Sequence, residues 1–331
     1  MNQGKVAVIR GGISRERDIS MWSGSEVLSV LGDRALDVVI EKDGTWRFGH
    51  DGPLSLCPAL ERLRGEASVV FLALHGPFGE DGTVQALLDS CGLAYTGSRG
   101  PASALAMDKA RTKLVYTGSQ LPTPPSVCVL DHHELDQKVE EALTNIPGPW
   151  VVKPARDGSS FGVEMCEDPS MLSSKARGIL ESGQEVVIEA RIIGREFSCG
   201  VLEDEEGRPF ALPVTEIIPE AGHTFFDFAA KYTPGHSTEV TPAEIPKELA
   251  ERVQRRAVSA HRILGCRHLS RTDFMHRADE TFLLETNTLP GMTKASIVPQ
   301  AAAAIGMSFA DLVSRLLSRA VADGPASWIS A

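Results

Sequence analysis

The sequence has few of the features that mark secreted, zinc-binding or membrane proteins. Its six cysteines are scattered along the chain, and no two of them form a CxxC pair. This spacing is typical of a reduced intracellular protein and argues against a disulfide or zinc framework. No apolar stretch approaches the length of a membrane span, and the first apolar run is too short for a signal peptide. We therefore expect a cytoplasmic protein that does not act in a membrane.

An excess of positive charge is also lacking. The formal net charge is -11, with 33 Lys and Arg against 44 Asp and Glu, and no dense basic block is present. These features argue against nucleic acid as a partner, although single lysines in a cleft can still bind a phosphorylated small molecule. The 331 residues, 42% of them hydrophobic and 23% charged, have an ordinary globular balance and are too many for one simple core. More than one domain is expected.

Three common nucleotide-binding or catalytic motifs are missing. The early segment GGISRER does not have the GxGxxG spacing of a dinucleotide site, and no stretch has the spacing of a P-loop. No GxSxG nucleophile elbow is present either. Ser159 and Ser160 lie in a glycine-containing turn, but no clear base and orienting group accompany them. A dehydrogenase, a P-loop nucleotide hydrolase and a serine hydrolase are all disfavoured.

Strand-like and helix-like segments alternate over the first hundred residues. Strands are predicted at 5–9, 36–42 and 68–74, and helices at about 14–31 and 83–92. This alternation predicts a Rossmann-like parallel α/β domain. We place it at 1–106, because turn residues interrupt the pattern at 95–101.

The remainder of the chain predicts an α+β arrangement in two parts. The first part, 107–192, opens with a helix and continues with short antiparallel strands near 149–154, 163–167 and 185–192. The second part, 193–331, contains two hairpins, near 195–218 and 270–287, and helices near 247–264, 296–305 and 309–322. Between them, the segment 219–246 has almost no regular pattern and is longer than compact domains usually tolerate. It contains FFDFAAKY, so we interpret it as an aromatic lid that excludes water from a site.

The hairpin near 270–287 carries polar side chains at alternate positions on both strands. Arg271 and Asp273 are two apart, as are Glu285 and Asn287, so each pair shares a face of its strand. If Asp273 lies opposite Glu285, and a three-residue loop at 278–280 closes the hairpin, all four side chains converge. Three of them offer hard oxygen ligands suited to Mg²⁺. A solvated polar face is the alternative, and a one-residue slip in register would separate the group.

Candidate anion-binding residues lie elsewhere in the chain. Lys153 ends an apolar strand and would be costly to bury without an anion. The turn RDGSSFG follows it, and such turns can point backbone N–H groups at a phosphate. Lys109 is a weaker candidate, because a single helical lysine is normally solvated. His75 follows a strand of the first domain, where α/β sheets place ligands, although a structural histidine is equally consistent.

The motifs in their order resemble the D-alanine–D-alanine ligases of the ATP-grasp superfamily. The resemblance runs from Val6 to about Phe309. The segments that carry it are GGISRERDIS, LHGPFGEDG, MDK, VVKPARDGSSFGV, IEARIIGREFSCGV, FFDFAAKY, SRTDF and LLETNTLPGMT. It implies an N-terminal α/β domain followed by a two-subdomain ATP-grasp fold, with ATP between the last two parts.

The resemblance also implies roles for particular residues. The residues implied for ATP are Lys109, Lys153, Ser160 and Lys231 at the phosphates, Glu189 and Ile192 at adenine, and Glu196 at ribose. Two Mg²⁺ ions, with Mn²⁺ as an alternative, would be held by Asp273, Glu285 and Asn287. Substrate binding would involve Glu16, His75 and Ser296. The residues implied for catalysis are Glu16, Ser159, Tyr232, Arg271 and Gly291.

The implied reaction joins two D-alanines through an acyl phosphate, for peptidoglycan precursor synthesis, in a homodimer. Two departures from the family, Leu289 and Lys294, leave the acceptor open, so D-lactate or D-serine as the second substrate is the alternative. Tyr232 is retained from the dipeptide-forming members and favours D-alanine. A catalytically silent sensor of ATP or D-alanine is disfavoured, because neither Arg271 nor a metal ligand has been lost.

Overall fold

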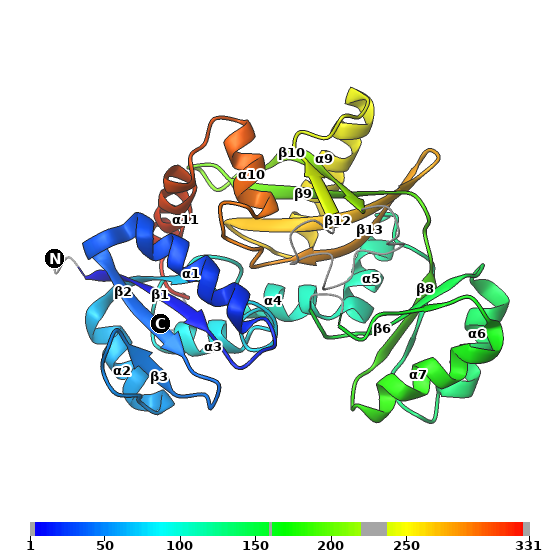
Figure 1. Cartoon of the computed structure of the whole chain (residues 1–331), viewed down its shortest axis with the longest axis horizontal. Helices are drawn as coiled ribbons and strands as arrows, with labels where there is room; N and C mark the ends of the chain where they lie inside the picture. The colour runs from blue at the N-terminus through cyan, green and yellow to red at the C-terminus, as the bar shows by residue number, and fades with distance from the viewer. Residues whose placement is uncertain (1–3, 159–160, 220–236, 327–331) are drawn as a thin grey trace.

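The computed structural model describes residues 4–158, 161–219 and 237–326 and arranges them around three sheets (Figure 1). Four residues with predicted roles, Ser159, Ser160, Lys231 and Tyr232, lie outside the described residues, as does most of the predicted lid.

The first sheet has the strand order β3-β2-β1-β4. Strands β1 (Lys5–Gly11), β2 (Ala35–Ile40) and β4 (Ala67–Leu72) are parallel, while β3 (Trp46–Phe48) pairs antiparallel with β2. The helices of this part are α1 (Arg17–Leu31), α2 (Leu56–Glu66) and α3 (Thr83–Ser90), with the short 3-10 helix η1 (Gly32–Arg34) after α1. The predicted parallel α/β arrangement is confirmed.

The second sheet is antiparallel and has the order β5-β8-β6-β7. Its strands are β5 (Ser126–Val129), β8 (Val186–Ala190), β6 (Trp150–Pro154) and β7 (Glu164–Cys166). Helices α6 (Leu135–Asn145) and α7 (Leu172–Glu181) lie beside this sheet in Figure 1 and share its core, with η2 (Pro169–Met171) before α7. Helix α5 (Lys109–Gly118) contacts β8.

The third sheet is also antiparallel, in the order β11-β10-β9-β12-β13. Its strands are β11 (Ser237–Val240), β10 (Pro209–Pro219), β9 (Arg195–Glu203), β12 (Leu269–Arg277) and β13 (Glu280–Asn287). Both predicted hairpins are confirmed. Strand β11 lies within the segment predicted to lack regular structure, so that prediction is wrong there. Pairing with β10, from Glu216↔Val240 to Pro219↔Ser237, forms the strand.

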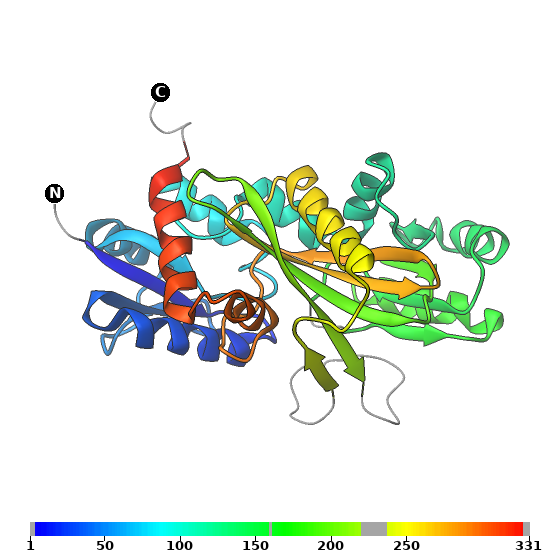
Figure 2. The ribbon, with the colours of Figure 1, turned by 90° about the horizontal axis from the view of Figure 1, so that it is seen from above.

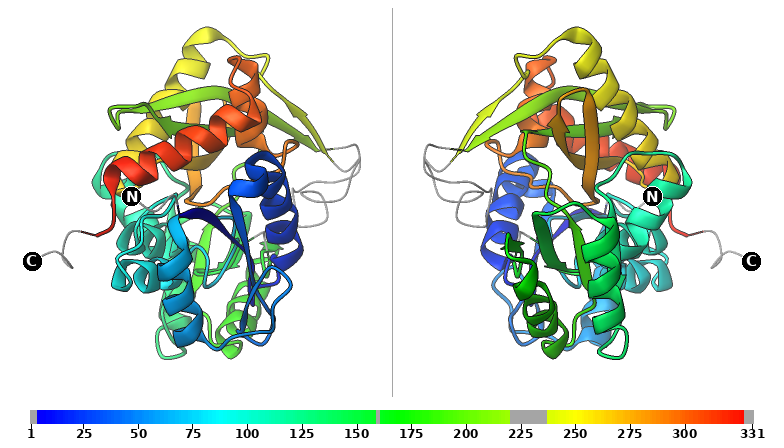
Figure 3. Two further views of the ribbon diagram at one scale, coloured as in Figure 1. Left: turned by 90° about the vertical axis from the view of Figure 1, so that its left-hand side faces the viewer. Right: turned by 90° about the vertical axis from the view of Figure 1, so that its right-hand side faces the viewer.

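Helices cover the third sheet and connect it to the first. Helix α9 (Lys247–Ile263) packs on β9, β10 and β12, and α10 (Ile297–Ala304) contacts β9 and β10. Helix α11 (Phe309–Asp323) runs along the junction of the first and third sheets (Figures 2 and 3). One hydrophobic cluster there contains Val8 and Phe71 of the first sheet, Leu202 of the third, and Leu316 of α11. Helix α4 (Gly100–Met107) spans the predicted domain limit at residue 106 and contacts β13 of the third sheet. The domain limits stay a prediction.

Within the described ranges, no single helix is long and apolar enough to cross a membrane. Helices α10 and α11 meet that test only as a pair, bent by 105°.

Candidate active site

The hairpin of β12 and β13 has the register on which the predicted metal site depended. Arg271 pairs with Asn287, and Asp273 pairs with Glu285. Beyond this point the register shifts, and Phe274 pairs with Leu283. This bulge uses one extra residue of β13, so the connecting turn contains only 278 and 279, and the predicted three-residue loop is wrong. Ala278 has a positive φ of 53° in this turn.

Arg271 and Asp273 form a two-pronged ion pair. Arg271 donates from Nε to Oδ1 of Asp273 at 2.9 Å and from Nη2 to Oδ2 at 2.8 Å. Ser198 Oγ donates to Oδ1 at 2.6 Å, and Asn287 Nδ2 donates to Oδ2 at 3.3 Å. The pairing holds the carboxylate in a fixed orientation and keeps the guanidinium beside it.

Lys109 faces the same patch from α5. Its Nζ lies 3.5 Å from Oε2 of Glu285 and donates to the carbonyl of Asp157 at 2.5 Å. Its side chain is only 10% exposed. The expectation that a single helical lysine is solvated is therefore wrong here, because the turn after β6 covers it.

The donor set at this patch fits a divalent cation. Asp273, Glu285 and Asn287 supply carboxylate and amide oxygens, the ligands that Mg²⁺ prefers. Arg271 and Lys109 lie against the two carboxylates, which shows that this face of the hairpin attracts positive charge. The solvated-face alternative does not fit, because Asp273 is 6% exposed.

A cavity of about 390 Å³ lies between the second and third sheets and opens onto this patch. Its polar lining includes the predicted nucleotide residues Lys109, Lys153, Glu189 and Glu196 and the predicted metal ligands Asp273 and Glu285. Its apolar lining includes Val151, Met165, Ile192, Met275 and Leu284. The structure thus brings together residues that are far apart in the sequence, in a slot with apolar walls and charged groups along it.

Glu189 is buried between two lysines. Lys153 Nζ donates to Oε1 of Glu189 at 2.5 Å, and Lys113 Nζ lies 2.9 Å from Oε2. Burial acts to raise the pKa of Glu189, but the two ammonium groups outweigh it and lower that pKa below its usual range. Burial lowers the pKa of Lys113, which Glu189 partly offsets. Sequence reasoning missed Lys113, since a lysine on a helix gives no signal of burial.

Glu16 lies where the first sheet meets the turn after β6. It is 7% exposed. A Cβ atom added to Gly158 would lie 2.6 Å from its Oε2, so a larger residue there would require the Glu16 carboxylate to shift. Gly158, in the turn after β6, therefore lies directly beside the Glu16 carboxylate. The substrate-binding and catalytic roles implied for Glu16 stay predictions.

His75 has both ring nitrogens engaged by the protein. Its Nδ1 lies 3.0 Å from the carbonyl oxygen of Leu289 and must donate the proton, so Nε2 accepts from Ser23 Oγ at 3.0 Å. Burial lowers the pKa of His75 to about 4, which keeps the ring neutral. The predicted contact with a substrate carboxylate stays a prediction and would require one of these bonds to break.

Glu80 is a second residue that sequence reasoning missed. Its Oε2 accepts from the Gly76 N–H at 2.8 Å, and its Oε1 accepts from the Leu289 N–H at 3.2 Å. Burial and the neighbouring Glu16 raise the pKa of Glu80 to about 8. The segment HGPFGEDG thus holds both backbone groups of Leu289, through His75 and Glu80.

The segment after Leu289 forms a tight turn. Ser296 Oγ would lie 2.7 Å from a Cβ atom added to Gly291. The same hydroxyl contacts Thr293 Oγ1 at 2.8 Å and accepts from the Thr293 N–H at 3.2 Å. Lys294 is largely exposed and lies 3.3 Å from Glu26 of α1. Gly291, implied for catalysis, and Ser296, implied for substrate binding, are therefore neighbours.

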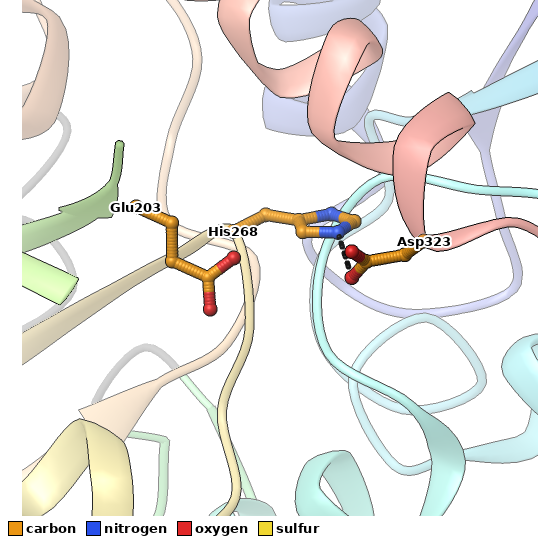
Figure 4. Close-up of side chains that lie close together, drawn as sticks. All are labelled: Glu203, His268 and Asp323. Carbon is orange, nitrogen blue, oxygen red and sulfur yellow. Dashed lines mark hydrogen bonds and ion pairs between the residues drawn. The ribbon is translucent and has the colours of Figure 1, made fainter. Parts of the chain in front are cut away.

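A second polar cluster, of Glu203, His268 and Asp323, lies away from the cavity (Figure 4). His268 Nδ1 accepts from the Gly97 N–H at 3.0 Å, so Nε2 carries the proton that points at Asp323, 3.1 Å away. Arg319 lies 3.5 Å from Glu203. Both imidazole nitrogens already have hydrogen-bond partners, and a guanidinium group lies next to Glu203. We therefore interpret this cluster as a structural contact that connects three chain segments, rather than as a metal site.

The cleft between two α+β units, with lysines along it and an acid-and-amide hairpin at one end, defines a ligase of the ATP-grasp class. Comparison with known families agrees. The model "D-ala D-ala ligase C-terminus" matches residues 116–318, and "D-ala D-ala ligase N-terminus" matches residues 57–98. The chain belongs to the D-alanine–D-alanine ligase family, whose members are ADP-forming ligases.

Individual relatives cover nearly the whole chain. A D-alanine–D-alanine ligase of Agrobacterium fabrum is 40% identical over 95% of this chain and 97% of its own, and one of Leptospira interrogans is 38% identical with the same coverage. Among solved structures, the VanG D-Ala:D-Ser ligase of Enterococcus faecalis has a TM-score of 0.85 at 29% identity, covering 96% of this chain and 99% of that one. The D-alanine–D-alanine ligase of Bacillus anthracis has a TM-score of 0.79 at 31% identity, covering 97% and 98%.

Proposed function

We propose that this chain joins two D-alanines into D-alanyl-D-alanine at the expense of ATP. The observation that carries the proposal is the convergence of Asp273 and Glu285 with Lys109 and Lys153 on one cavity, with Arg271 paired to Asp273 beside it. It occurs in a chain 38–40% identical to D-alanine–D-alanine ligases over nearly its full length.

ATP would occupy the cavity with its base at the Glu189 end. Glu189 and the backbone of Ile192 would bind adenine, and Glu196 would bind ribose. Lys109 and Lys153 would meet the phosphates, joined by Ser160 and Lys231. The apolar walls of the slot suit a flat base, and Lys109 lies beside Glu285 of the acidic hairpin.

Asp273, Glu285 and Asn287 would hold two Mg²⁺ ions, and the same oxygen set also suits Mn²⁺. When bound, the ions offset the negative charge of the phosphates as a carboxylate approaches. Arg271 and Lys109 would then turn from the carboxylates toward the reacting groups.

Different side chains would act in the two chemical steps. Glu16 would bind the ammonium of the first D-alanine, whose carboxylate attacks the γ-phosphate to give an acyl phosphate and ADP. The second D-alanine would bind through its carboxylate at Ser296, and its amine attacks the acyl phosphate. Arg271 and the Gly291 N–H would stabilise the tetrahedral oxyanion. Phosphate then leaves as the peptide bond forms.

The remaining proposals concern closure of the lid over the site and the cellular role of the protein. Tyr232 would hydrogen-bond with Ser159 and Glu16, so that the lid at 219–246 closes over the acyl phosphate and excludes water. His75 would lie near the carboxylate of the first D-alanine. We infer a cytoplasmic homodimer that supplies the peptidoglycan precursor for cell-wall synthesis. Within it, 1–106, 107–192 and 193–331 would form the N-terminal, central and C-terminal parts.

The direct test measures ADP formation with Mg²⁺ and ATP, comparing D-alanine with L-alanine as substrate. ADP formation that depends on D-alanine supports the proposal, and equal rates with both enantiomers would oppose it. Ligation of D-alanine to D-serine is the second candidate, favoured by the fold match to a D-Ala:D-Ser ligase. Leu289 and Lys294, the two departures from the family, leave this alternative acceptor open.

A further inference from the structure

Glu189 is held at both of its carboxylate oxygens by lysines that differ in what else they contact. Lys153 lines the cavity, and Glu189 lines it as well. Lys113 does not belong to the described residues that line the cavity. Its side chain contacts Glu189 from helix α5. Two ammonium groups for one carboxylate is more positive charge than the carboxylate alone requires. One of the lysines is therefore available for another partner.

Lys113 is the lysine that we expect to remain paired with Glu189. Its Nζ donates to Thr123 Oγ1 at 2.7 Å and to the carbonyl of Pro124 at 3.0 Å, in addition to its contact with Glu189. Two hydrogen bonds and one ion pair thus hold the ammonium group, and the residue is 3% exposed. Lys153, by contrast, lines the cavity wall, and its Nζ donates to Glu189 Oε1. Rotation of Lys153 toward a phosphate therefore leaves the contact between Lys113 and Glu189 intact.

We propose that Lys113 is a positioning residue that keeps the Glu189 carboxylate charged and oriented for a base with an amino group, while Lys153 is released to the phosphates. This inference rests on the proposed nucleotide site. According to this proposal, Lys113 influences which nucleotide base is preferred, although Lys113 does not itself contact the nucleotide.

The physical reason is the cost of a buried carboxylate without a counter-ion. If Lys153 turned away and Lys113 were missing, Glu189 would either take up a proton or draw Lys153 back. The charged groups that face Glu189 are Lys113 of α5 and Lys153 of β6, and Cys128 of the neighbouring strand lies near Lys113. A charged Glu189 accepts a hydrogen bond from the exocyclic amino group of adenine. It repels the carbonyl that hypoxanthine carries at the same position.

The test compares ATP with inosine triphosphate, which differs at that position, in wild type, K113M and K113Q. Wild type should prefer ATP strongly. In both variants the KM for ATP should rise about 10- to 100-fold, the loss expected for a hydrogen bond to a charged group. kcat should change much less, and the preference for ATP over inosine triphosphate should shrink.

The pH profile adds a readout that a merely structural role would not move. Loss of Lys113 raises the pKa of Glu189, so nucleotide affinity in K113M should fall as the pH is lowered from about 8 to about 6. Wild-type affinity should stay level over that range. The matched control is K138M, since Lys138 pairs with Glu141 on the surface of α6. Thermal unfolding of each variant confirms that it is folded.

Two outcomes would overturn the inference. The first is unchanged nucleotide KM and base preference in both folded variants. The second is an equal loss for the two nucleotides with an unaltered pH profile. The variant E189Q separates this failure from failure of the nucleotide site. If E189Q leaves the KM for ATP unchanged, the proposed site is wrong; if it raises that KM while K113M does not, only the role of Lys113 is wrong.

Discussion

The imidazole of His75 donates from Nδ1 to the carbonyl of Leu289 at 3.0 Å and so connects two segments more than 200 residues apart. Glu80 accepts from the N–H of the same residue at 3.2 Å. The turn that contains Gly291 and Ser296 is thus positioned by the first sheet. Its geometry depends on the joint packing of the first sheet and the C-terminal helices.

Replacing His75 tests this connection through the pH dependence of stability. Burial lowers the pKa of His75 from 6.5 to about 4, so the unfolded chain binds a proton that the folded chain rejects between those values. His75 therefore lowers the free energy of unfolding as the pH falls through this window, by about 3 kcal/mol. H75N should lose this part of the dependence in urea unfolding. The exposed H132N is the control, and an unchanged slope in H75N would contradict the buried neutral ring.

Glu80 should show the opposite dependence. Burial and Glu16 raise its pKa from 4.5 to about 8, so the folded chain favours the protonated form. Its contribution to stability is complete below about 4.5 and is lost as the pH rises through about 8. In E80Q, measured without substrates, this loss of stability with rising pH should be absent. E61Q, at an exposed position, is the control; a decline in E80Q equal to that of wild type would exclude Glu80 as its source.

The metal site predicts a specific loss in E285Q. The amide keeps the shape of the side chain but removes the negative charge that holds a divalent cation. Ligase turnover at a fixed Mg²⁺ concentration should fall by about 100-fold or more, with the circular dichroism spectrum unchanged. E280Q changes an exposed carboxylate of the same strand and should turn over normally. Wild-type turnover and Mg²⁺ dependence in E285Q would remove Glu285 from the metal site.

Arg271 should act on the chemical step rather than on nucleotide binding. R271K keeps a positive charge but loses the two-pronged contact and the fork that would face the oxyanion. We expect kcat to fall by about 100- to 1,000-fold while the KM for ATP changes little. R277K, at an exposed position of β12, is the matched control. If only the KM for ATP changed, the oxyanion role would be wrong.

The sequence predicted the hairpin register because polar residues at alternate positions on both strands leave few pairings that converge. It did not predict the bulge, because the extra residue, Leu284, is apolar and does not interrupt an apolar run. The four-residue strand β11 was missed as well, since its pairing with β10 and not its own composition forms it.

Long-range contacts account for the other differences. Lys109 and Lys113 look like ordinary helical lysines, and only the segments around Asp157 and Pro124, together with β8 and β13, bury them. Glu80 lies in the same sequence motif as His75, and its contact with Leu289 depends on a segment more than 200 residues away. The hydrophobic core shared by the first sheet and α11 also depends on contacts between distant segments, so the sequence did not predict it.

The central claim is tested most directly by incubating the protein with Mg²⁺, ATP and D-alanine, with and without D-serine or D-lactate. Phosphate is quantified, and the products are identified by mass. The account predicts D-alanyl-D-alanine in one-to-one ratio with phosphate, and D-alanine preferred when the acceptors compete. Phosphate release without dipeptide, or product only with another acceptor, would contradict it.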